Sequence, residues 1–345
     1  MTKLPLRIGI AGFGVVGQRR HQFIQQRPDM VTVAVCDRTL PGDGELDDGV
    51  RFHKDYTALL KEDLDALFVC LTNDIAAEVT IAGLNAGLHV FCEKPPGRNL
   101  EDISRVVECS KAHPKLKLKY GFNHRYHDSI QNALGIVQSG EMGRVINLRG
   151  VYGKSKFISY GEPSDWRTRR QIAGGGILLD QGIHMVDLMR LFAGEFEQIH
   201  SFLSNAFWGY DVEDNAYALM RTREGVVAML HSTATQWRHR FSLDVTLEKG
   251  AVNLSGILSG SKSYGEETLA VAWAANSDVG DPKEEITRYD HDPSWEREIA
   301  EFADVIFNDT PVISGSVDDA LETMRLVYRI YCADPQWKAR WGLGS

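Results

Sequence analysis

The strongest constraint on the fold is a regular alternation of short apolar runs and helical patterns in the first third of the chain. Apolar runs with the length of buried strands lie at 8–11, 31–36, 66–71, 89–92 and 117–120, and helical patterns lie between them at 15–26, 77–86 and 100–112. Continuous apolar strands separated by helices are typical of a parallel sheet that is covered by helices on both faces. The alternation stops near Phe122, so the sequence predicts an α/β domain over residues 1–122.

The rest of the chain has a different sequence pattern, in which predicted strands follow one another with few helices between them. Strand-like runs lie at 145–152, 199–203, 216–221, 226–232, 241–247 and 251–254, and helical patterns lie at 129–139, 181–192, 294–307 and 317–333. Turn signals such as Glu248-Lys249-Gly250 separate neighbouring runs, as antiparallel hairpins require. The sequence therefore predicts a second, α+β domain over residues 123–345, built on an antiparallel or mixed sheet.

A glycine-rich segment directly follows the first predicted strand and opens a helix. Its residues are Gly12, Phe13, Gly14, Val15, Val16 and Gly17, which match GxGxxG. In such a turn the first glycine permits the tight bend, the second lets backbone approach a pyrophosphate, and the third allows close helix–strand packing. Asp37 ends the second strand twenty residues past Gly17, where an acid binds an adenine ribose hydroxyl. This order predicts a Rossmann domain that binds a dinucleotide.

Two neighbouring residues bear on which dinucleotide is bound. The Asp37 carboxylate would repel a 2′-phosphate, which favours NAD. Arg38 could instead hold that phosphate, so NADP stays an alternative.

A Glu-Lys pair, Glu93 and Lys94, lies at the carboxyl end of the predicted strand 89–92. Ligands of open α/β sheets bind at that edge. Lys94 is therefore placed to donate a hydrogen bond to a reacting hydroxyl or carbonyl oxygen. From this stretch alone, a solvated loop lysine is an equal alternative.

A second glycine run, at 174–176, precedes a helical segment that carries Asp180 and His184. Residues four apart lie on one face of a helix. Imidazole has the side-chain pKa best suited to proton transfer near neutral pH. Taken alone, the pair could also be a helix cap and a core histidine. Asp187 could complete a metal cluster with them, but we predict no metal and a structural hydrogen bond for Asp187.

Composition excludes several classes of protein. The formal net charge of −9 argues against a basic nucleic-acid interface, and no apolar run is long enough to cross a membrane. The five cysteines contain no CxxC pair, so neither zinc nor a disulfide framework is expected. The N-terminus lacks the apolar region of a signal peptide. We therefore expect a cytoplasmic protein.

The motifs together resemble the Gfo/Idh/MocA family, which is the glucose–fructose oxidoreductase and inositol dehydrogenase family. The resemblance rests on residues 12–17, on Glu93-Lys94-Pro95, on 121–126 and above all on the GGGxLxDxGxHxxD pattern at 174–187. It implies an enzyme that transfers hydride between NAD(P) and a secondary alcohol or ketone of a sugar, sugar derivative, nucleotide sugar or cyclitol. It also implies a second domain with a large, open, mostly antiparallel sheet that forms a homodimer or homotetramer.

The resemblance, together with the motifs, assigns site residues. Lys94 would polarise the substrate oxygen, His184 would exchange its proton, and Asp180 would support both. Candidate cofactor-binding residues are Gly12, Phe13, Gly14, Val15, Val16, Gly17, Asp37, Arg38, Leu71, Thr72, Asn73, Glu93, Lys94, Asn123, Trp166 and Arg167. Candidate substrate-binding residues are Lys94, Arg125, Tyr126, Tyr152, Asp180 and His184.

Some of these assignments leave alternatives open. Family members often have TPNxxH after the fourth strand, whereas Thr72 and Ala76 stand at the proline and histidine positions here. Arg125 is as well suited to tethering the two domains as to substrate contact, and Trp166 could pack at the domain junction. For the whole chain, the alternatives are a non-catalytic NAD(P)-binding sensor or regulator, and a sugar-modifying enzyme for elimination or hydrolysis that retains NAD for a transient oxidation.

Overall fold

The structure is a computed structural model that describes residues 4–157, 166–259, 263–275 and 280–344. The chain divides into two compact units. The first comprises Met1–Asn123 and Trp295–Met324, and the second comprises His124–Ser294 and Arg325–Ser345. The chain thus enters the second unit, returns to the first, and ends in the second.

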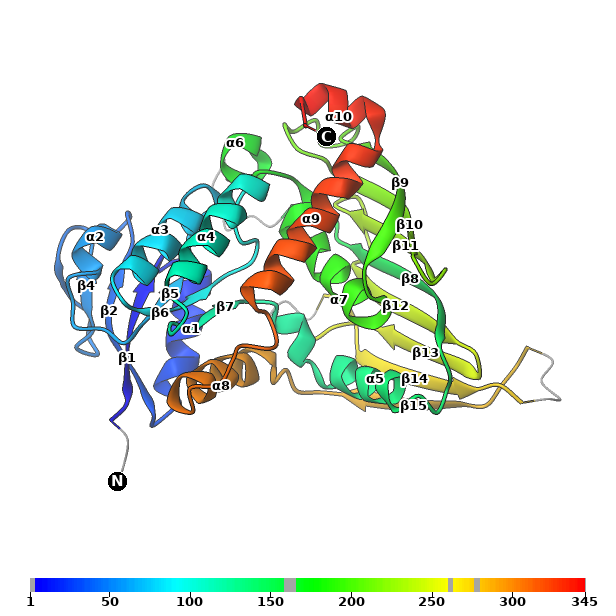
Figure 1. Ribbon diagram of the computed structural model, residues 1–345, viewed down its shortest axis with the longest axis horizontal. Helices are drawn as coiled ribbons and strands as arrows, with labels where there is room; N and C mark the ends of the chain where they lie inside the picture. The colour runs from blue at the N-terminus through cyan, green and yellow to red at the C-terminus, as the bar shows by residue number, and fades with distance from the viewer. Residues whose placement is uncertain (1–3, 158–165, 260–262, 276–279, 345) are drawn as a thin grey trace. The chain divides into compact units, whose positions relative to one another are not determined.

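A seven-stranded sheet forms the centre of the first unit, in the order β3-β4-β2-β1-β5-β6-β7 (Figure 1). Its strands are β1 (Leu6–Ala11), β2 (Met30–Cys36), β3 (Gly44–Glu45), β4 (Arg51–His53), β5 (Ala66–Val69), β6 (His89–Cys92) and β7 (Leu118–Tyr120). All neighbouring strands are parallel except β3 and β4, which pair antiparallel. The predicted parallel sheet is confirmed, and β3 and β4 are additions that the sequence analysis missed.

Helices cover both faces of this sheet. α3 (Asn73–Asn85) and α4 (Leu100–Ala112) pack side by side on one face (Figure 1). α1 (Val15–Gln25) and α8 (Ser294–Phe307) cover the other face, and the short α2 (Tyr56–Leu59) lies beside β4. Asn99 begins α4 as its N-cap, because its side chain accepts a hydrogen bond from the Asp102 amide.

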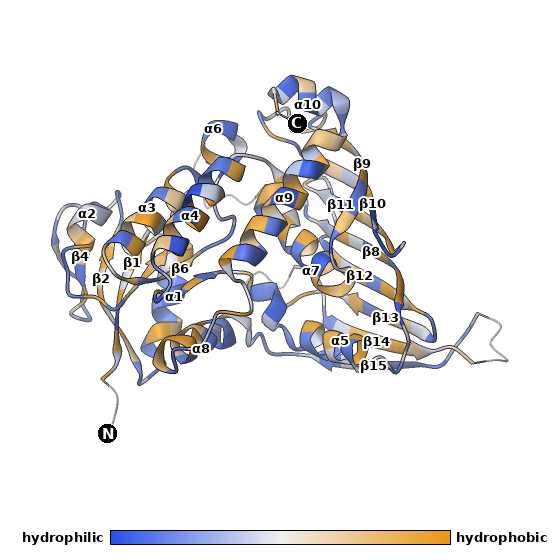
Figure 2. Ribbon diagram, viewed as in Figure 1, coloured by the Kyte–Doolittle hydropathy of each residue, from blue (hydrophilic) through white to orange (hydrophobic). Residues whose placement is uncertain are grey.

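The position of α8 differs from the sequence analysis, which placed all of 123–345 in the second domain. The Phe302 ring meets the rings of Phe68 and Phe91 edge-on, at 5.6 Å from each, in the core of the first unit. The helix is amphipathic, with hydrophobic and hydrophilic residues both evident in Figure 2. Such a pattern shows that a helix must bury one side, but not which sheet it covers.

The second unit is built on an eight-stranded sheet in the order β15-β14-β13-β12-β8-β11-β10-β9 (Figure 1). Its strands are β8 (Val145–Gly153), β9 (Phe196–Ser204), β10 (Asn215–Thr222), β11 (Val227–Thr233), β12 (Arg240–Leu247), β13 (Gly250–Ser255), β14 (Glu267–Trp273) and β15 (Glu284–Tyr289). β8 and β11 are parallel, and the other pairs are antiparallel. The predicted mixed, mostly antiparallel sheet is confirmed, although β14 and β15 were not predicted.

Helices pack against one face of the second sheet. α5 (Asp128–Ser139) lies against β13 and β14, and α7 (Ile183–Ala193) lies against β8 and β11. Gly150 on β8 makes room for α7, because a Cβ there would collide with Met185 and Met189. α9 (Val317–Ala333) runs from the first unit into the second, and α10 (Pro335–Trp341) follows it.

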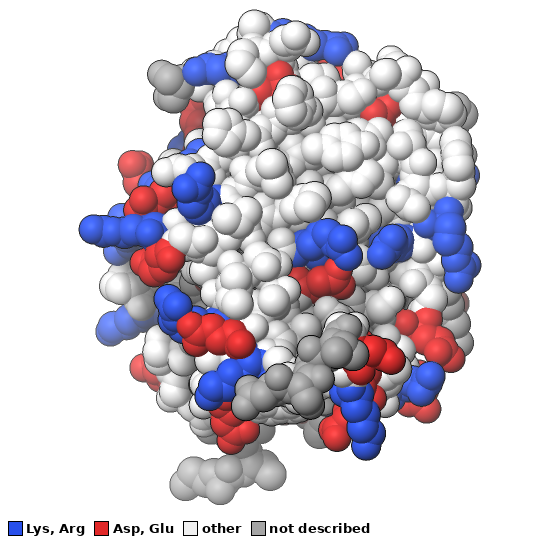
Figure 3. Space-filling view, turned by 90° about the vertical axis from the view of Figure 1, so that its right-hand side faces the viewer, with Lys and Arg blue, Asp and Glu red and all other residues white. Residues whose placement is uncertain are grey.

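The opposite face of this sheet carries exposed apolar side chains. Tyr217 and Leu219 alternate with buried residues along β10, and their partners in the ladder are Phe202 on β9 and Met229 on β11. Figure 3 views the molecule from this side and shows a broad area without charged side chains. Among the described residues, no helix is long and apolar enough to span a bilayer.

Candidate active site

The glycine-rich turn at the start of α1 has the shape that its sequence predicts. Gly12 has φ +93°, and a Cβ there would overlap the carbonyl oxygen of Cys70. A Cβ on Gly17 would overlap the carbonyl oxygen of Gly12, so close packing requires this glycine. Gly14 is different, because no atom lies within 4 Å of where its Cβ would be. It is the N-cap of α1, so open space adjoins backbone amides that can receive a phosphate.

Asp37 follows β2 and holds this turn in place. Its Oδ2 accepts a hydrogen bond of 2.9 Å from the Phe13 amide, and its Oδ1 accepts two from Thr39. The carboxylate therefore lies beside the glycine turn and caps its own loop at the same time. The adjacent Arg38 is exposed. On the other side of the turn, Val15 and Val16 are the first two residues of α1.

The segment after β5 turns directly into α3. Thr72 is the N-cap of the helix, and its hydroxyl donates a 2.5 Å hydrogen bond to Asp74. Asn73 is buried at the first helical position, and Leu71 is half-buried. Thr72 thus precedes α3 as its N-cap, and its hydroxyl bonds to the Asp74 side chain rather than to a backbone amide of the helix.

Glu93 and Lys94 follow β6, and a buried arginine holds the glutamate. Arg20 on α1 donates through Nε to Glu93 Oε1 at 2.7 Å and through Nη2 to Glu298 Oε2 on α8 at 2.8 Å. Its guanidinium also lies over the rings of Phe91 and Trp295 at 4.4 and 4.3 Å. Lys94 itself is half-buried and joined to Pro95 by a cis peptide bond.

Burial and charge oppose each other in this triad. Burial disfavours the Arg20 charge, but the Glu93 and Glu298 carboxylates outweigh it and raise the pKa of the guanidinium. Burial raises the pKa of Glu298 to about 7, although the Arg20 charge opposes the shift. A Cβ on Gly121 would lie 2.9 Å from Glu93 Oε2, so this glycine leaves room for the triad. The Glu93-Lys94 turn is thereby fixed to both α1 and α8.

In the second unit, Asp180 and His184 lie on one continuous helical segment. A π-helix over Leu178–Gly182 carries Asp180 and passes into α7, whose second residue is His184. Single π turns in longer helices occur frequently at functional sites. Both side chains are buried, at 8% and 4% exposure, and Arg167 Nε lies 3.4 Å from Asp180 Oδ1. Trp166 and Arg167 form a short 3-10 helix with Thr168, and the indole stacks on the guanidinium at 4.4 Å.

A second histidine lies against His184. The ring of His124 stacks on the His184 ring at 3.8 Å with an interplanar angle of 11°. The Nε2 atom of His124 lies 3.0 Å from the Tyr152 hydroxyl, and burial raises the pKa of that tyrosine well above its ordinary value. The predicted residues Asp180, His184 and Tyr152 therefore belong to one buried polar group. His124 is an additional member of it.

The glycine run before the π-helix is held by Glu213. Its carboxylate accepts hydrogen bonds of 2.8 and 2.9 Å from the amides of Gly176 and Leu178, and one of 2.8 Å from the Tyr331 hydroxyl. A Cβ on Gly176 would overlap the Glu213 backbone, and one on Gly175 would overlap the Tyr331 hydroxyl. Burial raises the pKa of Glu213 to about 7, while these donors oppose the shift. The glycines thus let the chain approach Glu213 closely.

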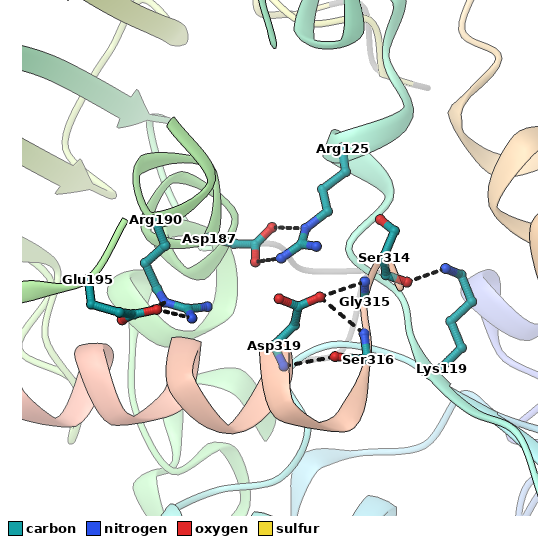
Figure 4. Close-up of polar contacts among 9 residues, drawn as sticks. All are labelled: Lys119, Arg125, Asp187, Arg190, Glu195, Ser314, Gly315, Ser316 and Asp319. Atoms are coloured by element: carbon teal, nitrogen blue, oxygen red, sulfur yellow. Dashed lines mark hydrogen bonds and ion pairs between the residues drawn. The ribbon is translucent and has the colours of Figure 1, made fainter. Parts of the chain in front are cut away.

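Arg125 and Asp187 form a buried two-point ion pair, with bonds of 2.8 Å from Nε and 2.6 Å from Nη2 (Figure 4). Asp187 thus makes the hydrogen bonds predicted for it. Asn123, Arg125 and Tyr126 lie in one 3-10 helix (Asn123–Tyr126), where Arg125 and Tyr126 are buried.

Within the described part of the chain, no three His, Cys, Asp or Glu residues are grouped so that they could hold a metal ion.

Comparison with known families matches both halves of the chain. A model of the oxidoreductase family with an NAD-binding Rossmann fold matches residues 6–122, and a model of the GFO/IDH/MocA C-terminal domain matches residues 130–253. The chain belongs to the Gfo/Idh/MocA family. It therefore carries the NAD-binding oxidoreductase fold of that family, as its motifs predicted.

Individual relatives are distant. D-glucoside 3-dehydrogenase of Escherichia coli strain K12 is 28% identical over 284 residues, covering 74% of this chain and 75% of that protein. Levoglucosan dehydrogenase of Pseudarthrobacter phenanthrenivorans is 29% identical over 151 residues, covering 44% of this chain and 38% of its own length. A solved structure of levoglucosan dehydrogenase with NADH is similar with a TM-score of 0.84 at 20% identity, covering 96% of this chain and 98% of that one. At this identity the structural likeness shows the fold alone.

Four residues around the site were missed by the sequence analysis. Arg20 and Glu298 are 278 residues apart, and no sequence pattern connects them. Glu213 lies just before β10, and no sequence pattern around it indicates that its side chain is buried. His124 stood in a visible polar cluster at 123–127, but its stacking partner is remote in sequence.

Proposed function

We propose that the chain transfers hydride between the nicotinamide of NAD or NADP and a secondary alcohol or ketone of a sugar, sugar derivative, nucleotide sugar or cyclitol. The observation that carries the proposal is the retention of the Asp180–His184 pair, buried and stacked on a second histidine, in a member of an NAD-binding oxidoreductase family. Two relatives named as dehydrogenases of a glucoside and of levoglucosan support a carbohydrate-type substrate.

The first unit fits a dinucleotide. The open space at Gly14 and the free amides at the start of α1 suit a pyrophosphate, and Asp37 lies beside them for an adenine ribose. Residues 71–73, Asn123, Trp166 and Arg167 complete the proposed cofactor contacts. When bound, the nicotinamide accepts or donates the hydride.

The chain's own residues supply the remaining chemistry. Oxidation of a secondary alcohol needs a group that accepts the hydroxyl proton and a donor that stabilises the oxygen. We assign the first role to His184, the second to Lys94, and the orientation of the imidazole or of a neighbouring hydroxyl to Asp180. Tyr126 and Tyr152 are proposed substrate contacts. Arg125 already directs Nε and Nη2 to Asp187, which favours a role in holding α7 over one in substrate contact.

Lys94→Met and His184→Ala test these roles. Each variant should lose turnover by roughly 10²–10⁴-fold, because proton transfer or oxygen stabilisation is removed. His184→Ala should also bind NADH like the parent protein, since His184 is not among the proposed cofactor contacts. Turnover is measured by NADH absorbance over a panel of sugars, polyols and nucleotide sugars. Lys111→Met, on the exposed end of α4, is the matched control. Near-full turnover in either variant would refute the assignment.

The preference for NAD over NADP rests on Asp37. Its carboxylate beside the glycine turn disfavours a 2′-phosphate by charge repulsion. We expect kcat/KM to be higher with NAD than with NADP, and Asp37→Ser to narrow the difference. At least equal efficiency with NADP in the parent protein would reverse this preference, with Arg38 as the residue that then holds the phosphate.

We also propose that the chain forms a homodimer or homotetramer through the exposed face of the second sheet. An apolar face of this kind is typical of a surface that another chain covers. Leu219→Glu should release monomers in analytical ultracentrifugation, whereas Arg223→Glu, in the exposed turn after β10, should not. A monomeric parent protein at assay concentration contradicts the proposal.

The proposed location is the cytoplasm. All five cysteines are free in the structure, as suits a reducing compartment. Fractionation of cells that produce the protein checks this directly, and recovery in a secreted fraction would contradict it.

A further inference from the structure

A hollow on the second unit lies at the start of β12 and beside the segment that leads into β14. Its volume is about 490 Å³, within the range of small-ligand pockets. Arg238, His239, Arg240, Phe241 and Tyr264 are among its lining residues. None of them was assigned a role by the motifs of the family.

The lining of this hollow is positively charged in a chain whose net charge is −9. The side chains of Arg238 and Arg240 form no ion pair with any other residue in the described part of the chain. One acid, Glu266, also lines the hollow, but it is directed to Arg288, with 3.5 Å between Oε2 and Nε. Among the residues that the structure describes, the two guanidinium groups that line the hollow thus have no carboxylate partner.

His239, between the two arginines, is held in place by two serines. Its ring nitrogens lie 3.0 Å from the Ser155 hydroxyl and 2.9 Å from the Ser263 hydroxyl. Burial lowers the pKa of His239, and the charges of Lys154 and Arg238 lower it further. The imidazole and its serines thus form a fixed wall, while the arginines supply the charge.

Aromatic side chains connect the hollow to the Asp180–His184 pair. The Tyr264 hydroxyl accepts a 2.6 Å hydrogen bond from Gln181, the residue after Asp180. On the other side, the Phe241 ring lies 6.0 Å from the ring of His124, which stacks on His184. Lining residues of the hollow therefore contact the residues that adjoin Asp180 and His184.

We propose that this hollow binds an anionic group, a carboxylate or a phosphate, that the substrate carries away from its reacting carbon. The inference rests on the proposed function and narrows its substrate class to acidic or phosphorylated carbohydrates. Guanidinium groups suit this task because their planar donors match carboxylate and phosphate oxygens in two-point hydrogen bonds. The opposite view is that both arginines are simply hydrated at the surface.

A binding experiment separates these views without requiring turnover. The NADH-loaded protein is titrated in a calorimeter with D-glucose, D-glucuronate and D-glucose 6-phosphate. We expect at least one of the two anionic sugars to bind tenfold or more tightly than glucose, with an advantage that shrinks as salt is raised. Whether glucuronate or the phosphate ester is preferred identifies the source of the charge.

Two variants assign the effect to the hollow. Arg238→Gln and Arg240→Gln should each weaken binding of the preferred anionic sugar by tenfold or more and leave glucose and NADH binding unchanged. Arg144→Gln, which removes an exposed arginine paired with Glu248 elsewhere on the same unit, should change nothing. Equal affinity for neutral and anionic sugars, or unchanged binding in both hollow variants, overturns the inference.

The proposed function fails by a different measurement. If Lys94→Met or His184→Ala keeps near-full turnover, the catalytic assignment is refuted even when anionic sugars bind through the two arginines. If turnover depends on Lys94 and His184 but neutral and anionic sugars bind with equal affinity, only the anionic subsite is refuted.

Discussion

Buried ion pairs hold the segments around the site at the scale of single residues. Arg125 and Asp187 are the clearest pair, because both are buried and joined by two hydrogen bonds. Removing one partner of such a pair leaves an uncompensated charge in the interior, which costs more than the pair itself contributes. Close by in Figure 4, Arg190 pairs with Glu195, whose side chain is 59% exposed.

Asp187→Ala should lower the free energy of unfolding by about 3–5 kcal/mol, because the Arg125 charge stays buried without its carboxylate. Glu195→Ala should lower it by less than Asp187→Ala, because the Glu195 carboxylate is exposed even though Arg190 is largely buried. Differential scanning calorimetry of the two variants beside the parent protein measures the difference. Equal losses of unfolding free energy in the two variants would show that burial does not determine how much the Arg125–Asp187 pair contributes to stability.

Glu213 combines three hydrogen bonds in one buried carboxylate, so its replacement should loosen the glycine run. Glu213→Gln keeps one acceptor oxygen but replaces the other with an amide NH₂ group. That group is a donor, and it would face an N–H or O–H donor that now bonds to the carboxylate. We expect about 1–3 kcal/mol of stability to be lost, together with faster hydrogen exchange at the Gly176 and Leu178 amides. Glu197→Gln, on exposed β9, is the control. Unchanged exchange at both amides would contradict this account.

At the scale of elements, patterns with a strong period were predictable and short or remote elements were not. The apolar runs of β1, β2 and β6 mark strands within two residues of their observed bounds. β3 and β4 span two and three residues, too few for any period to show. The predicted helix at 181–192 begins instead as a π-helix at Leu178, whose amide donates to the remote Glu213 carboxylate.

The same limit applies to the site. Lys94, Asp180 and His184 stand in local motifs that can be found in the sequence. The contacts of Arg20 with Glu298, and of Glu213 with Tyr331, join elements that only tertiary packing brings together. Local patterns therefore predict which residues carry functional groups, whereas the residues that hold them require the structure.

The second and third glycines of the turn, Gly14 and Gly17, give a matched test of one element. Gly14→Ala places its methyl group in open space, so the protein should melt at the parent temperature but bind NADH at least tenfold more weakly. Gly17→Ala forces a methyl group against the Gly12 carbonyl, so α1 must shift from β1, and both stability and NADH binding should fall. Calorimetry and fluorescence titration with NADH measure the two effects.

If Gly14→Ala binds NADH as tightly as the parent protein does, the dinucleotide does not bind at this turn. A parent-like melting temperature in Gly17→Ala would instead show that α1 can move without cost. The pair therefore separates the binding role of the turn from its packing role.

At the scale of the whole molecule, the returning segment Trp295–Met324 places a carboxylate, Glu298, in the interior of the first unit. Its folded-state pKa of about 7 lies above the ordinary value of 4.5, so the folded state binds a proton that the unfolded state releases between these values. The stability that this adds is fully present below about pH 4.5 and is lost as the pH rises through about 7. Partly buried histidines with lowered pKa values, such as His89 and His231, act in the opposite direction.

Because these groups oppose each other, the pH profile of the parent protein cannot isolate Glu298, but a comparison with Glu298→Gln can. The glutamine stays neutral at every pH, so both proteins should be similarly stable near pH 4.5. Above pH 7 the variant should be more stable by about 3 kcal/mol, since one pKa unit corresponds to about 1.4 kcal/mol. Glu296→Gln, exposed on the same helix, should follow the parent curve throughout. Calorimetric melting temperatures from pH 4.5 to 8 test this, and parallel curves for parent and Glu298→Gln would show that Arg20 keeps Glu298 charged across the whole range.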